Sequence, residues 1–123
     1  MQTIHTPNAP AAIGPYSQAK IAGNLVFTSG QIAIDPAVQK ITATTIEGQT
    51  EQIMKNLTAI LEAAGTSMDK VVKTTCFLAE IADFAAFNAV YAKYFPGKPA
   101  RSCFAVKDLP AGALAEVEVI AEL

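Results

Sequence analysis

The sequence is poor in the side chains on which metal and nucleotide chemistry depend. Its 123 residues include one histidine, His5, no tryptophan, and two cysteines that lie far apart, Cys76 and Cys103. No cluster of potential ligands has metal-binding spacing. Neither a G-x-G-x-x-G pattern nor a P-loop occurs. We therefore expect no metal site and no phosphate-binding loop, and His5 is interpreted as a surface residue near a terminus.

Charge is also scarce, at 16% of residues against about 25% in an average soluble domain. Nine Lys and Arg and eleven Asp and Glu give a net charge of -2, and no two basic residues are adjacent. A nucleic-acid partner is therefore disfavoured. No apolar run approaches the ~20 residues that span a bilayer, and Met1–Pro10 lacks a secretory pattern. We expect a soluble, cytoplasmic protein with free thiols and no membrane partner.

The hydrophobic content of 51%, with a mean hydropathy of +0.30, is high for a chain of this size. The length predicts a single domain over residues 1–123, large enough to bury a core without disulfides. Small monomers seldom expose large apolar patches, so we expect part of the surface to close against identical copies. The alternative is that abundant alanine, which is tolerated on exposed helix faces, accounts for the surplus.

Periodicity predicts alternating strands and helices. A capping box at Thr44–Glu47 predicts the start of one helix, and Gly65 its end. Asp83 is expected to cap a second helix, which Pro96 and Gly97 stop. β-branched and aromatic residues predict a strand over 25–29, and the segment 16–21 is expected to pair with it as a hairpin. Alternating residues predict strands over 71–78, 101–106 and 115–121. The predicted order is β-β-α-β-α-β-β, an α+β fold with both helices on one face of the sheet.

Two polar features on the last strands are candidates for chemistry. Arg101 follows Pro99 at the start of a strand, and its guanidinium suits bidentate binding of a small organic acid. The alternative is an ion pair at a surface or interface. Cys103 shares the face of Arg101, and is otherwise a small buried hydrophobe. Glu116 opens the last strand, where it is a candidate general base toward water if the two strands pair. Glu118 shares its face, and a solvated sheet edge explains both glutamates equally well.

Two further positions lie beside turns. Tyr16 follows Gly14 and Pro15, which can fix its ring, although an ordinary packed aromatic is the alternative. Ser29 and Gly30 end a strand, and the glycine permits close approach of a ligand to the backbone.

Taken together, several segments resemble the RidA/YjgF/UK114 family of reactive-intermediate deaminases over nearly the whole chain. The most specific is Pro99-Ala100-Arg101-Ser102-Cys103. The others are Gly14-Pro15-Tyr16-Ser17-Gln18-Ala19, Phe27-Thr28-Ser29-Gly30-Gln31, Val72-Lys73-Thr74-Thr75, Asp83-Phe84 with Phe87-Asn88, and Glu116-Val117-Glu118. One departure is the loop at 35–40, which lacks the glycine that relatives commonly carry near its tip.

The resemblance implies a chorismate-mutase-like α+β fold, assembled as a homotrimer with ligand clefts between subunits. It implies a hydrolase that converts reactive 2-imino acids, such as 2-iminobutanoate and 2-iminopropanoate, to 2-oxo acids and ammonia without a metal or organic cofactor. Arg101 would hold the substrate carboxylate and Glu116 would activate water. The cleft would be lined by Tyr16, Ser29, Gly30, Asn88 and Cys103. A non-catalytic module that binds 2-oxo acids is the alternative, and a chaperone or an RNA-cleaving protein has less support.

Overall fold

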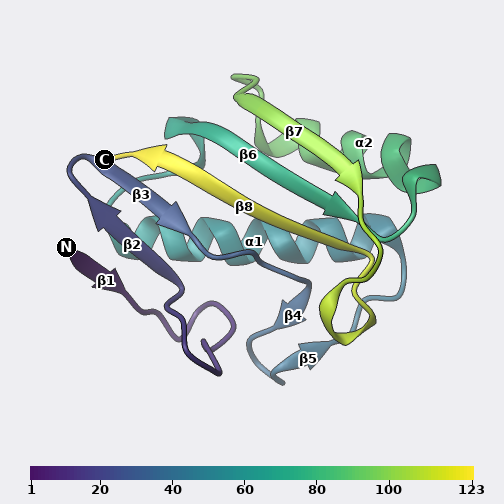
Figure 1. Cartoon of the computed structure of the whole chain (residues 1–123), viewed down its shortest axis with the longest axis horizontal. Coiled ribbons are helices and arrows are strands. Elements are labelled where there is room, and N and C mark those ends of the chain that lie inside the picture. The colour runs from purple at the N-terminus through teal and green to yellow at the C-terminus, as the bar shows by residue number, and fades with distance from the viewer.

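The computed structural model describes all residues from Met1 to Leu123. Its strands and helices run in the order shown in Figure 1. The strands are β1 (Gln2–Ile4), β2 (Ala19–Ala22), β3 (Leu25–Thr28), β4 (Ile34–Asp35), β5 (Lys40–Ile41), β6 (Val71–Leu78), β7 (Ala100–Ala105) and β8 (Ala115–Glu122). The helices are α1 (Ile46–Ala64) and α2 (Phe84–Tyr94), and three short 3-10 turns lie at Met68–Lys70, Ile81–Asp83 and Pro110–Gly112.

Six strands form one sheet in the order β1-β2-β3-β8-β6-β7. All neighbouring pairs are antiparallel except β6 and β7, which are parallel and are joined through α2. Both helices lie behind the sheet in the view of Figure 1, on the same face. The predicted α+β architecture with its helices on one face is therefore confirmed. The sequence prediction omitted β1, the outermost strand, and the small β4–β5 hairpin.

Helix boundaries follow local side-chain chemistry, with two corrections to the predicted caps. The hydroxyl of Thr45, rather than that of Thr44, accepts from the Gly48 N–H at 3.1 Å, so α1 begins one residue later than the capping box indicated. Gly65 ends α1 with φ of 88°, as predicted. Asp83 makes no capping bond, because the 3-10 turn at Ile81–Asp83 leads directly into α2.

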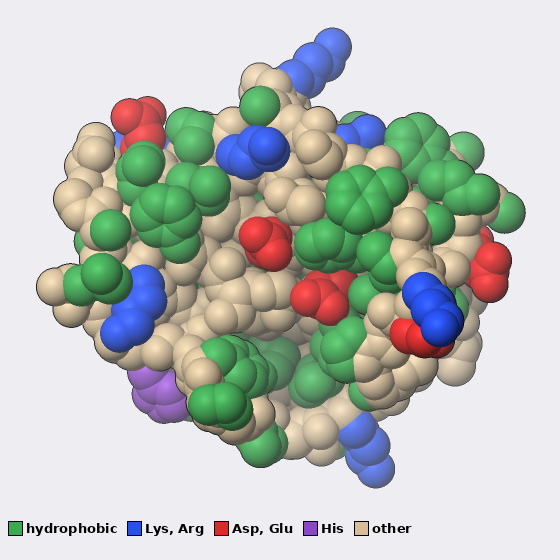
Figure 2. Space-filling model, viewed as in Figure 1, with side chains coloured by type: hydrophobic (Ala, Val, Ile, Leu, Met, Phe, Trp, Pro, Cys, Tyr) green, Lys and Arg blue, Asp and Glu red, His purple; other side chains and the backbone are tan.

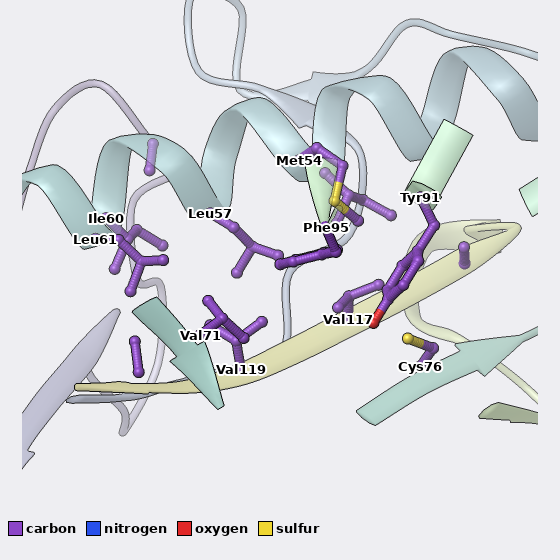
Figure 3. Close-up of a cluster of buried hydrophobic side chains, with 14 of the residues drawn as sticks. Met54, Leu57, Ile60, Leu61, Val71, Cys76, Tyr91, Phe95, Val117 and Val119 are labelled. Atoms are coloured by element: carbon purple, nitrogen blue, oxygen red, sulfur yellow. The ribbon is translucent and has the colours of Figure 1, made fainter. Parts of the chain in front are cut away.

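The core lies between α1 and the sheet (Figure 3). Alternation on the central strands follows the prediction: Thr74, Cys76 and Leu78 of β6 are buried, as are Val117 and Val119 of β8. Buried side chains of α1 pack on this face, each contributing about 1.5–3 kcal/mol; they are Ile53, Met54, Leu57, Ile60 and Leu61. Phe84, the first residue of α2, is 38% exposed.

Two polar residues of α1, Asn56 and Gln49, are buried. The amide of Asn56 donates to the carbonyls of Ile34 at 2.9 Å and Ile32 at 3.3 Å. The Gln49 side chain accepts from the Leu114 N–H at 2.9 Å. Loops packed against a helix need partners for their backbone groups. These amides therefore attach the loops at 32–34 and 113–114 to α1.

The β4–β5 hairpin explains the missing loop glycine. Gln39 takes the left-handed conformation, with φ of 56°, that glycine commonly supplies. Its side-chain carbonyl accepts from the Ala11 N–H at 3.3 Å, and its amide donates to the Pro36 carbonyl at 2.9 Å. The glutamine therefore supports a conformation that would otherwise favour glycine, and it links the hairpin to the N-terminal loop.

No helix covers the other face of the sheet. Phe27 and Phe104 are 40% and 45% exposed there, and Phe104 packs edge-on against Phe77 with ring centroids 5.5 Å apart. Figure 2 looks onto this face and shows hydrophobic side chains around two acidic groups near its centre. We call it the open face. None of the helices has the length and apolar character needed to cross a membrane.

Candidate functional site

The first cavity is built around Glu116, which β8 places on the open face. Two backbone hydrogen bonds between Gln31 and Val117, of 2.8 and 3.1 Å, hold the segment after β3 against β8. This bridge puts Gly30 directly against the Glu116 carboxylate. A Cβ on Gly30 would lie 2.0 Å from Glu116 Oε2. The glycine is therefore required for close approach, since its φ is not positive.

The Glu116 cavity has a volume of about 440 Å³. The backbone N–H and carbonyl of Gly30 make no hydrogen bond within the chain, so both are free for a ligand. The Ser29 hydroxyl donates to the Ser17 carbonyl at 2.5 Å, while Tyr16 is about half exposed at the rim. Besides these groups the wall includes Pro10, Ala11, Gln18, Gln31, Ile32, Ile34 and Pro110.

Burial raises the pKa of Glu116, and the charge of Glu118 on the same strand face raises it further. The Glu116 carboxylate accepts no hydrogen bond within the chain, and the cavity wall contains no other charged residue. A carboxylate in such surroundings can take up and release a proton at a bound molecule. No group of three His, Cys, Asp or Glu side chains gathers to hold a metal ion.

Gln18 is a structural element of this site whose role sequence reasoning did not identify. Its side-chain carbonyl accepts from the Thr6 N–H at 2.7 Å, and its amide donates to the carbonyls of Thr6 at 3.0 Å and Pro10 at 2.8 Å. The side chain is fully buried. It therefore fixes the N-terminal loop that forms one wall of the cavity. The only sequence signal was its place beside Tyr16 in the quoted family segment.

The second cavity is built around Arg101, the second residue of β7, which lies beside α2. Arg101 Nη1 donates to Asn88 Oδ1 at 2.6 Å. The guanidinium carbon lies 4.7 Å from the Tyr91 ring centroid and 5.6 Å from that of Phe84. The one ion pair of the chain joins Lys93 and Glu51, so Arg101 has no carboxylate partner.

The Arg101 cavity has a volume of about 340 Å³, and Lys98 is the only other charged residue in its wall. The remaining wall is formed by Asn88, Tyr91, Ala92, Phe95, Pro96 and Pro99. Because both charged groups are cations, the cavity favours an anion. An unpaired guanidinium can bind a planar carboxylate through two parallel hydrogen bonds.

Cys103 lies two residues beyond Arg101 and directly opposite Cys76 in the β6–β7 pairing. Both cysteines are free. Burial raises the pKa of the Cys76 thiol to about 12. Burial also raises the pKa of the half-buried Cys103, although the positive charge of Arg101 opposes that shift. Cys103 faces the helices and lines neither cavity.

The two candidate strands are not neighbours, which corrects the sequence interpretation. Strand β6 lies between β7 and β8, because β7 joins the outer edge of β6 through α2. Arg101 is paired with Thr74, which faces the helices, whereas Glu116 is paired with Phe77, which faces away from them. The structure therefore brings together Glu116, Gly30, Ser29 and Tyr16 in one cavity and Arg101 with Asn88 in another. The two cavities open on opposite faces of one sheet.

Comparisons with known proteins agree with this fold over its whole length. The family model described as endoribonuclease L-PSP matches residues 6–123. A Lactococcus lactis protein whose name describes it as a regulator, AldR, is 52% identical over 100% of this chain and 98% of its own. Reactive Intermediate Deaminase A of Arabidopsis thaliana is 50% identical over 99% of this chain and 66% of its own. The crystal structure of E. coli TdcF with bound serine has a TM-score of 0.95 and 39% identity, and the match covers 100% of this chain and 99% of the TdcF chain. On this evidence the chain belongs to the RidA/YjgF/UK114 family, whose family model bears the endoribonuclease L-PSP description.

Proposed function

We propose that the protein is a hydrolytic deaminase of small 2-imino acids, and that its working site forms between copies of the chain. The observation that carries this proposal is the separation of two complementary groups. Arg101, a cation without an acidic partner, and Glu116, a partly buried carboxylate, lie on opposite faces of one sheet. A single small molecule can meet both only if the Arg101 cavity of one copy faces the Glu116 cavity of another.

The assembly we propose is a homotrimer, with three such sites. The open face supports self-association because it exposes large apolar side chains, Phe27 and Phe104, together with both acidic and basic residues. Burying that face would account for the hydrophobic surplus of the sequence. A closed ring of head-to-tail contacts repeats the same pair of cavities at every interface.

The reaction needs few protein groups. A protonated imine has an electrophilic carbon, so a positioned water can add to it to form a carbinolamine. Glu116 would accept a proton from that water and return it to the nitrogen. It would then accept the hydroxyl proton of the carbinolamine as the nitrogen leaves as ammonia and the carbonyl of the 2-oxo acid forms. Arg101 would hold the carboxylate that the substrate and the product share. Tyr16, Ser29 and Gly30 would line the assembled cleft, whereas Cys103, which lines neither cavity, would not.

The comparisons support this chemistry. One relative with 50% identity is named a reactive intermediate deaminase. A similar structure is described with bound serine, a small molecule that carries a carboxylate. The endoribonuclease description of the family is less well matched by this chain, which has a net charge of -2 and no adjacent basic residues.

A mixing experiment tests both the chemistry and the shared site. Threonine dehydratase with threonine supplies 2-iminobutanoate, and semicarbazide trapping follows its loss. We expect Arg101→Ala and Glu116→Ala each to be inactive alone. After the two variants are unfolded and refolded together, about a quarter of the sites should be intact, because each site draws its arginine and glutamate from different chains. A mixture with no activity would refute the shared site, and an inactive wild-type protein would refute the deaminase.

A second candidate function is a module that binds 2-oxo acids without turnover, which the regulator name of the Lactococcus lactis relative favours. Calorimetry with 2-oxobutanoate separates the two candidates. Binding that is lost in Arg101→Ala, without acceleration of imine hydrolysis by the wild-type protein, would support the binding module.

A further inference from the structure

We propose that Asn88 and Tyr91 form an uncharged clamp that fixes the Arg101 guanidinium while leaving its full positive charge for the ligand. Both would be positioning residues that act through Arg101. This inference deepens the proposed function and rests on it where ligand binding is concerned. It assigns to Asn88 a contact with the arginine, where the sequence analysis had placed it in the lining of the substrate cleft.

The first arm of the clamp is a side-chain amide. Asn88 lies in the second turn of α2, and its Oδ1 accepts from Arg101 Nη1 at 2.6 Å. An arginine side chain carries five N–H donors. Asn88 is the only residue of the chain that accepts a hydrogen bond from the Arg101 guanidinium. The contact therefore orients the planar guanidinium and leaves most of its donors for a carboxylate.

The second arm is an aromatic face with a buried anchor. The Tyr91 ring lies under the guanidinium at 4.7 Å, and its hydroxyl lies 2.7 Å from the Thr74 hydroxyl. Thr74 is fully buried and is the residue paired with Arg101 across β6 and β7. Figure 3 shows the Tyr91 ring reaching from α2 to the sheet beside Cys76. The hydroxyl contact fixes the tilt of the ring, and the ring face attracts the cation without neutralising it.

No acidic residue lies beside the Arg101 guanidinium. Proteins commonly hold an arginine with a carboxylate, and such a pair would occupy the same donors that a substrate carboxylate needs. Here the wall of the Arg101 cavity contains no acidic residue, and its other charged member is the cation Lys98. Burial also raises the pKa of the Tyr91 hydroxyl, which keeps that partner neutral. Every group that holds Arg101 is therefore uncharged.

The decisive comparison is between Asn88→Asp and Asn88→Ala. Aspartate has the shape of asparagine and keeps the acceptor, so a clamp that only positions Arg101 predicts near wild-type behaviour for Asn88→Asp and a loss for Asn88→Ala. A clamp that must stay neutral predicts the opposite order. We expect Asn88→Asp to weaken 2-oxobutanoate binding by at least tenfold and more than Asn88→Ala does, with KM for the imine raised and kcat much less changed. Binding of 2-oxobutanoate by Asn88→Asp that is as tight as binding by Asn88→Ala, or tighter, would overturn the proposal.

A second readout needs no ligand, because Arg101 is the only arginine of the chain. Phenylglyoxal, which modifies guanidinium groups, can therefore label a single site, and intact-protein mass spectrometry follows it. We expect labelling of folded Asn88→Asp to be several-fold slower than that of the wild type, and labelling of Tyr91→Leu to be faster. Equal rates in Asn88→Asp and wild type would refute the neutral clamp.

This measurement also separates the two proposals. A wild-type protein without deaminase activity or oxo-acid binding would refute the proposed function, while the labelling rates would still decide whether the neighbours of Arg101 preserve its charge. Tyr91→Phe keeps the ring but loses the hydroxyl contact with Thr74, and we expect its labelling rate to lie between those of the wild type and Tyr91→Leu. Thermal unfolding of each variant confirms that the labelled state is folded.

Discussion

Replacing Gly30 by alanine should disable the site while leaving the fold intact. The new Cβ would lie 2.0 Å from Glu116 Oε2 and 2.8 Å from its Cδ, where ordinary contacts begin near 3.4 Å. The carboxylate must therefore move by more than 1 Å. The backbone has no reason to move, because the φ of Gly30 is not positive and the clashing atoms end a flexible side chain. A misplacement of this size can cost about 100-fold in rate, or about 2.7 kcal/mol of transition-state stabilisation.

The assay is semicarbazide trapping of 2-iminobutanoate, with kcat/KM measured for Gly30→Ala and for a matched control. Gly97→Ala is that control, since a Cβ there meets no atom within 4 Å. Wild-type kcat/KM in Gly30→Ala would refute the assignment of Glu116, whereas an unfolded variant would refute the packing argument.

Three further outcomes follow from the buried groups. Because burial raises the pKa of Glu116 above 4.5, ionisation of this carboxyl costs more in the folded state, and the stability of the protein falls as pH rises through the folded-state pKa. Glu116→Gln should therefore raise Tm at pH 7 and change Tm much less at pH 4. An equal shift in Tm at both pH values would contradict this. Gln18→Leu removes four hydrogen bonds to the N-terminal loop and should lower the free energy of unfolding by about 2–4 kcal/mol in denaturant titrations, against little change for exposed Gln2→Leu. Iodoacetamide should label Cys103 well before Cys76, whose pKa burial raises to about 12, and the difference should vanish in denaturant; equal labelling of the folded protein would be the contrary result.

The elements and their faces could be predicted because periodicity records which side chains a strand or helix buries. The alternation of Thr74, Cys76 and Leu78 against their neighbours fixed the inner face of β6, and the same pattern fixed that of β8. Gly65 marked a helix end because few other residues adopt its backbone conformation. These signals are local, so a single sequence is enough to read them.

Strand order could not be predicted in the same way, because it depends on pairings between distant segments. Nothing near Arg101 or Glu116 indicates that β6 lies between their strands. The burial of the Asn56 and Gln49 amides could not be predicted for a related reason. Their partners are loop backbone groups at 32–34 and 114, and hydrophobic periodicity does not report such contacts. The contact between Gly30 and Glu116 likewise depends on the Gln31–Val117 bridge, and no sequence motif indicates that bridge.

The wall of the Glu116 cavity combines one residue of a central strand with residues of irregular segments. Glu116 lies on β8, the strand whose neighbouring residues Val117 and Val119 are buried in the core. The packing of those residues therefore fixes the position of the Glu116 backbone. The opposite wall comes from irregular segments around residues 10–11, 32–34 and 110. Changes in those segments can remodel the space available to a substrate side chain without touching the reactive group. Selectivity can thus drift through loop substitutions while the reaction itself is retained.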